Sequence, residues 1–196
     1  MNKKRRLCCI VWCVLLLTGI GFAGDKVKYP NRKQVVFVFS CKIEPSPNTE
    51  FFAEYNSDYK KSNDVKDGIS MKVRYDGAGS SSEVYQEDLQ RGGFSMITCT
   101  LPSGRKRTLE IGTIQYTFAN LEWFHIRLPI KAEVTVPDDV RFVYLGDFLC
   151  KCRLPFYDII DVERIDNFDE AADAVEEVYG GDAELVRLPL RSINNE

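Results

Sequence analysis

The sequence predicts a mainly β fold, an antiparallel β-sandwich of about eight strands with one C-terminal α-helix near residues 168–179. Three observations carry this prediction. Apolar residues occupy every even position from 124 to 136, a pattern typical of a strand with one buried face. Runs rich in β-branched and aromatic residues recur along the chain with turn-forming residues between them. One stretch near the C-terminus has instead the apolar spacing of a helix.

Residues 1–23 have the three parts of a secretory signal peptide. Basic residues at positions 3–6 precede an apolar run over 7–22, and small residues at 21 and 23 offer a cleavage site after Ala23. The apolar run is shorter than the roughly 20 residues that a spanning helix needs. We therefore expect export to the periplasm, the cell surface or the medium. An uncleaved membrane anchor is the alternative, and it would be the chain's only membrane contact.

Cleavage would make the remaining chain acidic and leave a single domain. The first 23 residues contain four of the 26 basic groups and none of the 29 acidic groups, so their removal gives a formal charge of −7. This charge excludes nucleic acid as a leading partner, because phosphates would be repelled. We expect residues 24–34 to form a polar leader and residues 35–192 to form one β-sandwich domain.

The first half of the domain alternates between strands and polar loops. Residues 35–43 are apolar on both faces at first, which predicts a strand covered on both sides that ends at Pro45. Residues 69–75 alternate as an amphipathic strand. The other expected segments are a short strand over 51–55, a surface loop over 56–68, a flexible stretch over 76–82 and a strand over 94–101.

The centre of the chain is predicted to be a bulged strand followed by a long β-hairpin. Apolar alternation over 109–118 changes phase at Gly112, which indicates a β-bulge. The strand over 124–136, the turn at 137–139 and a second run over 140–152 then predict a hairpin with one buried face. A further strand is expected through 159–162.

The helix is predicted from its ends as well as from its apolar face. Asn167 is the N-cap candidate, and Glu170 three residues later completes a capping-box arrangement. Gly180 and Gly181 end the helix. A last short strand over 184–190 is limited by Pro189.

Signal cleavage would leave four cysteines, and an oxidising compartment favours disulfides among them. Two of them share one face of the strand over 140–152, so each could reach a cysteine on a facing strand. Buried free thiols are the close alternative. A zinc site is a weaker one, because the Cys-x-x-Cys pairs of structural zinc sites are missing. The disulfide candidates are Cys41, Cys99, Cys150 and Cys152.

No catalytic arrangement is recognisable in the sequence. His125 is the single histidine and falls on the polar face of its strand, and no Gly-x-Ser-x-Gly motif offers it a nucleophile. The run Arg105-Lys106-Arg107 could grip an anion, but a charged run beside a turn is usually a solvated tip. No pair of carboxylates stands out as a glycosidase pair. We therefore predict no catalytic residues, no metal and no cofactor.

One resemblance covers roughly the C-terminal third. Residues 136–148 (VPDDVRFVYLGDF) and the Asp-x-Phe-Asp-Glu-Ala motif at 166–171 resemble uncharacterised exported bacterial β-sandwich proteins. In outline these are similar to transthyretin-like or carboxypeptidase-regulatory-like sandwiches, and the sandwich that we expect is immunoglobulin-like or transthyretin-like. The resemblance implies a protein of the cell envelope or cell surface and supplies no active-site residues.

Together these observations predict a non-catalytic binding or structural module of the cell envelope. Its partner would be an unidentified protein or glycan of the envelope. The alternative is a hydrolase of envelope polymers that uses an unrecognised carboxylate pair. We expect function to reside in the loops over 56–68 and 76–82, because loops on a rigid scaffold commonly carry binding residues.

Overall fold

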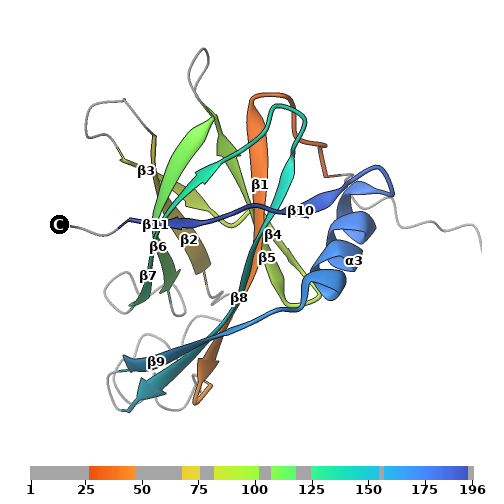
Figure 1. The fold of residues 1–196 in the computed structure, drawn as a ribbon. Coiled ribbons are helices and arrows are strands. Elements are labelled where there is room, and N and C mark those ends of the chain that lie inside the picture. The colour runs from red at the N-terminus through yellow and green to blue at the C-terminus, as the bar shows by residue number, and fades with distance from the viewer. Residues whose placement is uncertain are drawn as a thin grey trace, which may run out of the picture.

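The computed structural model of the chain describes residues 27–46, 68–75, 82–101, 107–117, 125–154 and 157–193. Within these residues the strands form a six-stranded and a five-stranded sheet, and α3 (Phe168–Tyr179) packs on the first of them (Figure 1). The sandwich-like, mainly β fold with one C-terminal helix is confirmed. Of the helices in this described part, none has the length and apolarity needed to cross a membrane.

The first sheet has the order β10-β8-β1-β5-β4, and β9 also pairs with β8. It is mixed rather than purely antiparallel, because β1 and β10 both run parallel to β8. Its strands are β1 (Gln34–Glu44), β4 (Leu89–Arg91), β5 (Phe94–Thr100), β8 (Phe142–Arg153), β9 (Asp158–Ile165) and β10 (Leu185–Arg187).

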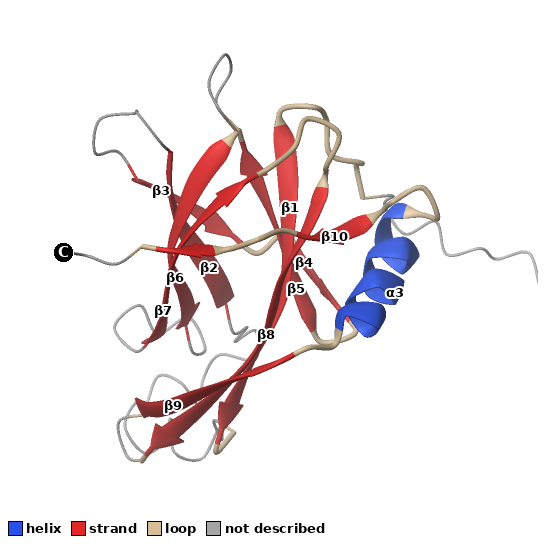
Figure 2. Ribbon diagram, viewed as in Figure 1, coloured by secondary structure: helices blue, strands red, loops and turns tan. Residues whose placement is uncertain are grey.

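The second sheet has the order β11-β7-β6-β2-β3, and every pairing in it is antiparallel. Its outermost strands are short, whereas its three central strands are longer (Figure 2). Its members are β2 (Gly68–Tyr75), β3 (Ser82–Gln86), β6 (Thr108–Thr117), β7 (His125–Thr135) and β11 (Arg191–Ser192).

β1 lies at the centre of the molecule because both of its faces are apolar. Val35, Phe37 and Phe39 enter the core between the two sheets. Val36 and Val38 point the other way, into a second core beneath α3. A strand covered on both sides was predicted here, and the unbroken burial of residues 35–40 confirms it.

The predicted hairpin over 124–152 is wrong. Its two strands form as β7 and β8, but β7 pairs with β6 and β11 while β8 pairs with β1, β9 and β10. The turn after Val136 therefore carries the chain from one sheet to the other. Period-2 alternation identifies the buried face of a strand but does not identify its neighbour, and β8 is buried on both faces over most of its length.

The helix occupies its predicted residues, but its start is stabilised differently. Asn167 makes no side-chain cap hydrogen bond. Its backbone N–H instead donates to the Tyr144 hydroxyl at 2.9 Å and to the Asp147 carboxylate at 3.2 Å, both on β8. The capping-box prediction is therefore wrong, because tertiary contacts satisfy the helix start. Gly180 ends the helix at a φ of 97°, as the glycine pair predicted.

Other predicted elements have mixed outcomes. The strands over 69–75, 94–101 and 159–162 form as β2, β5 and β9, and the phase change at Gly112 is a true bulge of β6 in its pairing with β2. The short strands β3, β4 and β11 were not predicted. The signal peptide over 1–23, the strand over 51–55 and nearly all of the loops over 56–68 and 76–82 lie outside the described residues.

Candidate functional site

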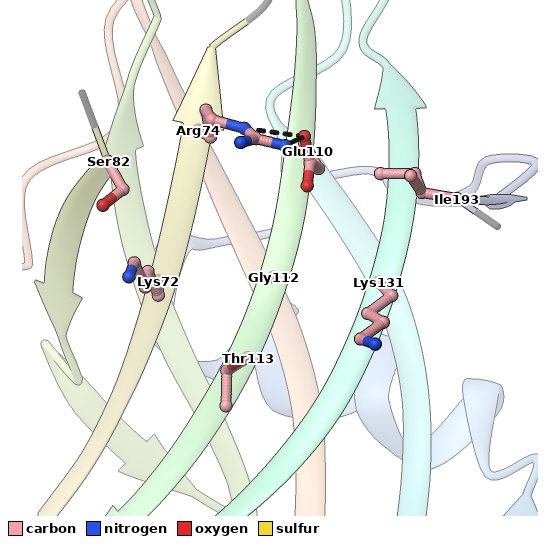
Figure 3. Close-up of a pocket in the computed structure, with 8 residues that line it drawn as sticks. All are labelled: Lys72, Arg74, Ser82, Glu110, Gly112, Thr113, Lys131 and Ile193. Carbon is pink, nitrogen blue, oxygen red and sulfur yellow. Dashed lines mark hydrogen bonds and ion pairs between the residues drawn. The ribbon is translucent and has the colours of Figure 1, made fainter. Parts of the chain in front are cut away.

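A groove of about 390 Å³ crosses the outer face of the second sheet (Figure 3). It lies on the side of the sheet that faces away from the inter-sheet core, because its strand residues alternate with the buried ones. We call it the outer groove. Its described lining residues are Lys72, Arg74, Ser82, Glu110, Gly112, Thr113, Lys131 and Ile193.

One row of charged residues crosses the outer face of the second sheet, and two of its members, Arg74 and Glu110, line the outer groove. Arg74 on β2 is the cross-strand partner of Glu110 on β6, which in turn partners Glu133 on β7. Arg191 on β11 follows as the partner of Glu133. Arg74 Nε donates a hydrogen bond of 2.8 Å to Glu110 Oε2. Directly opposed residues in antiparallel strands point to the same face, so the row reads Arg, Glu, Glu, Arg across four strands.

Two register shifts at Gly112 form the floor of the groove: Gly112 is an extra residue of β6 against β2, and β7 has an extra residue against β6. Pairing shifts from Ile111 with Ala132 to Thr113 with Pro129, so Gly112 faces two residues of β7 instead of one. One of these two is Lys131, whose φ of 45° lies in the left-handed region that a residue with a Cβ seldom adopts. The bulge thus places a side chain of unusual orientation beside a glycine that has none.

Two lysines stand on either side of this floor. Figure 3 shows Lys72 from β2 and Lys131 from β7 flanking Gly112 and Thr113. Both lysines are exposed. Of the described lining residues three are cationic and only Glu110 is anionic, and Glu110 already binds Arg74. The groove is therefore locally positive on a chain whose formal charge is −3.

The side chains present limit what the outer groove can do. Its described lining residues include two hydroxyls but no aromatic ring, histidine or cysteine. Stacking on the flat face of a neutral sugar and nucleophilic catalysis by a base-activated hydroxyl both lack their usual groups. An anion between the lysines is the ligand chemistry that the groove fits best.

The four disulfide candidates fall into two places. Cys41 Sγ on β1 and Cys150 Sγ on β8 lie 3.8 Å apart, and Cys152 Sγ lies 3.7 Å from the carbonyl oxygen of Cys150. The hydrogen bond with Cys150 raises the pKa of Cys41, and burial raises the pKa of Cys152 to about 11. Cys99 lies apart from these three on β5, where burial raises its pKa.

All four cysteines are thiols in this structure, so a disulfide among them stays a prediction. Sequence reasoning placed two of them on one strand face and left their partner open. The structure brings Cys41 next to Cys150 and keeps Cys99 away. Among the described residues no three potential metal ligands gather into one group.

The remaining sequence candidates do not line the outer groove. His125 is half-buried at the first position of β7. Arg107 is the described member of the basic run, and its guanidinium donates to the carbonyls of Arg32 at 2.7 Å and Val136 at 3.0 Å. Its guanidinium therefore holds neighbouring backbone segments together and is not a free anion-binding group.

Sequence reasoning missed the outer groove, although one signal pointed to it. The phase change at Gly112 marked the bulge, but only the strand register shows that Lys72 and Lys131 lie on either side of it. Comparisons of the chain with protein-family models, with curated proteins and with solved structures found no significant match.

Proposed function

We propose that this chain is a non-catalytic binding module of the cell envelope that holds an acidic sugar unit of an envelope glycan in the outer groove. The observation that carries the proposal is the pair Lys72 and Lys131 across the open floor at Gly112. A sugar carboxylate between two ammonium groups would gain charge-assisted hydrogen bonds. The export predicted from residues 1–23 is part of the proposal and would bring the module to such a polymer.

A glycan is favoured over a simple anion because the outer groove also offers hydrogen-bond acceptors. The Glu110 carboxylate and the hydroxyls of Ser82 and Thr113 border the same space. Sugar hydroxyls can donate to these oxygens while the acid group contacts the lysines. A ligand that carries both a carboxylate and several hydroxyls matches this lining better than a bare inorganic ion does.

The experiment is a binding assay with polygalacturonate as the acidic polymer and dextran as the uncharged one. The wild-type chain should bind polygalacturonate and not dextran. The double variant Lys72→Gln/Lys131→Gln should bind at least about tenfold more weakly at low salt, because both charged donors are lost. Lys33→Gln/Lys42→Gln is the matched control, since both of these lysines are exposed and lie outside the outer groove.

A second variant, Gly112→Val, tests the floor of the outer groove without changing the charge of its lining. A Cβ on Gly112 would lie 3.6 Å from the carbonyl oxygen of Lys72, an ordinary contact, and Gly112 has no positive φ. Gly112→Val should therefore fold and still fill the space between the lysines. Undiminished binding by Gly112→Val, or equal losses in both double-lysine variants, would contradict the proposed site.

One observation keeps a hydrolase as a second candidate. Glu110 and Glu133 are direct cross-strand partners and therefore form a carboxylate pair on one face. A hydrolase would release new reducing ends from polygalacturonate, and Glu133→Gln would stop that release. A binding module would leave the polymer intact in both forms of the protein, which is the outcome we expect.

A further inference from the structure

A second cavity, of about 520 Å³, lies at the edge of the sandwich where β7 faces the hairpin formed by β8 and β9. We call it the edge cavity. Figure 1 shows this hairpin extending away from α3. The residues just before and within β11 border the cavity as well, through Leu190 and Ser192. The edge cavity and the outer groove share none of their described lining residues.

The walls of the edge cavity are apolar. Leu128 and Ile130 come from β7, Phe148 from β8, and Ile159 and Val162 from β9. The Val162 side chain is 39% exposed, although it is directed to the same side of the hairpin as the buried Cys150, its cross-strand partner. An apolar side chain left open to solvent within a concave space indicates a surface that a ligand can cover.

Two arginines also line this space, and they come from different strands. Arg127 belongs to β7 and Arg164 to β9. Arg127 Nε donates to Gln115 Oε1 at 3.3 Å, and Arg164 Nη2 donates to the Leu145 carbonyl at 2.7 Å. Each guanidinium has five N–H donors, so these bonds leave others for a ligand. None of the described lining residues is acidic.

The position of Arg164 is built into the fold. Gly146 has a φ of 114°, and a Cβ on it would lie 2.7 Å from Arg164 Nε. The guanidinium therefore occupies the space that a side chain at position 146 would take. This packing and the hydrogen bond to the Leu145 carbonyl fix the guanidinium beside the edge cavity. A ligand that binds there therefore loses little free energy to ordering the Arg164 side chain.

An added peptide strand is a poorer fit for the edge cavity. On the cavity side of β7, β11 pairs with Glu133 and Ala132, and no described strand pairs there with the residues before them. Pro129 sits in this part of β7 and has no N–H to give to an incoming strand. Proline in an edge strand is a common protection against strand addition.

We propose that the edge cavity binds an amphipathic carboxylate, with its alkyl chain on the apolar walls and its carboxylate held by Arg164 and Arg127. The apolar walls alone would accept any hydrophobic chain, whereas the two arginines select an anionic head. This site is independent of the proposed glycan site, since neither depends on the residues of the other.

The test is equilibrium dialysis of the full chain with radiolabelled decanoate at concentrations where decanoate does not aggregate. Saturable one-site binding is expected. Decyltrimethylammonium, with the same chain and the opposite charge, and acetate, with the same head and no chain, should each bind at least about tenfold more weakly. Arg164→Gln and Arg127→Gln should each weaken decanoate binding by about tenfold.

Two further variants separate the edge cavity from nonspecific effects. Val162→Ser changes an exposed wall residue and should weaken decanoate binding severalfold without unfolding the chain. Arg153→Gln removes an arginine at the end of β8 whose side chain is 69% exposed and should leave binding unchanged. If Arg164→Gln disturbs folding, Arg127→Gln on β7 still tests the head group.

Several outcomes would overturn the proposal. These are the absence of saturable decanoate binding, equal binding of the ammonium analogue, and unchanged affinity in both arginine variants. A concentration-dependent dimer that Val162→Ser abolishes, found without decanoate binding, would show instead that a second copy of the chain covers the edge cavity.

Discussion

The Ser40 hydroxyl donates a hydrogen bond to the buried carboxylate of Asp147, joining two parallel strands whose residues are 107 positions apart in the chain. Asp147 is 3% exposed and also accepts hydrogen bonds from the Tyr144 hydroxyl and from the backbone N–H of Asn167 at 3.2 Å. One carboxylate thus ties β1, β8 and the start of α3 together.

Removing this carboxylate should be costly. Asp147→Ala leaves the hydroxyls of Ser40 and Tyr144 without their acceptor, whereas the Asn167 N–H keeps its bond to the Tyr144 hydroxyl. We expect a loss of about 2–4 kcal/mol in the free energy of unfolding. Urea unfolding measures it. Asp161→Ala is the control, because the side chain of Asp161 is 59% exposed and its ion pair with Lys151 lies at the surface. Equal losses in the two variants would contradict the role given to Asp147.

Gly146 is expected to tolerate no side chain. At a φ of 114°, Gly146→Ala should cost about 1–3 kcal/mol in backbone strain alone. Contact with Arg164 adds a steric part. In an Arg164→Ala background that steric part disappears, so the same change at Gly146 should cost less there. A double-mutant cycle by urea unfolding measures the difference, and additive effects would exclude the contact.

The backbone strain at Lys131 predicts opposite stability effects on the two sides of the outer groove. Lys131→Gly should raise the free energy of unfolding by up to about 1 kcal/mol, because glycine adopts the φ of 45° without a Cβ clash. Lys72→Gly, in an ordinary strand conformation, should lower it by about 1 kcal/mol.

Binding should separate from stability in the same pair of variants. Both Lys131→Gly and Lys72→Gly should weaken polygalacturonate binding, since each removes a cation from the outer groove. Thermal unfolding and the binding assay together check this. A destabilised Lys131→Gly variant would show that contacts of the lysine side chain outweigh the backbone strain.

Alkaline pH should destabilise the fold through the partly buried Tyr179. Burial raises the pKa of Tyr179 from its ordinary 10 to about 12, and Tyr179 packs against Phe142 with ring centroids 4.8 Å apart. The folded state therefore keeps a proton that the unfolded state loses. Stability from this group is complete below pH 10 and is lost as the pH rises from 10 toward 12.

Urea unfolding between pH 8 and the alkaline limit, with tyrosinate absorbance recorded in parallel, tests this expectation. Tyr179→Phe should show a shallower fall in stability above pH 10, because that proton no longer titrates. The effect is smaller than full burial would give, since Tyr179 is only partly buried. Identical pH profiles for Tyr179→Phe and the wild type would contradict it.

The thiol geometry predicts which disulfide forms under oxidation. With oxidised glutathione as the oxidant, Cys41 and Cys150 should lose two protons and two electrons to it and become linked, because their sulfurs lie 3.8 Å apart. Peptide mapping should find these two cysteines joined. Cys99→Ser should leave the product unchanged, whereas Cys41→Ser should abolish it. A link through Cys99, or four free thiols after oxidation, would contradict the prediction.

The sequence predicted the faces of the strands better than their neighbours. β1 has a run of residues that is apolar on both faces, and β7 alternates between apolar and polar residues. Both patterns indicate burial directly, because side-chain polarity follows solvent exposure. The pairing of β1 with β8 depends on backbone hydrogen bonds that are alike for every residue type, so the run after Val136 was misread as a hairpin. β3 was not predicted, because an exposed edge strand has little apolar pattern.

The candidate site was less predictable than the fold. A bulge at Gly112 could be seen in the sequence, but the facing position of Lys131 depends on the register between β6 and β7. The approach of Cys41 to Cys150 likewise follows from the parallel pairing of β1 with β8. In each case residues far apart in the chain are brought together by strand pairing, which local patterns do not encode.

The place of β1 between β5 and β8 sets an order of assembly for the chain. Of the described strands β1 is synthesised first, yet Ser40 meets Asp147 only after another 107 positions have followed. Until β8 has been made, β1 lacks one of its two neighbouring strands. Such distant pairing slows folding. A chain whose first described strand must wait for residues in its last third would stay incompletely folded until most of it has been made.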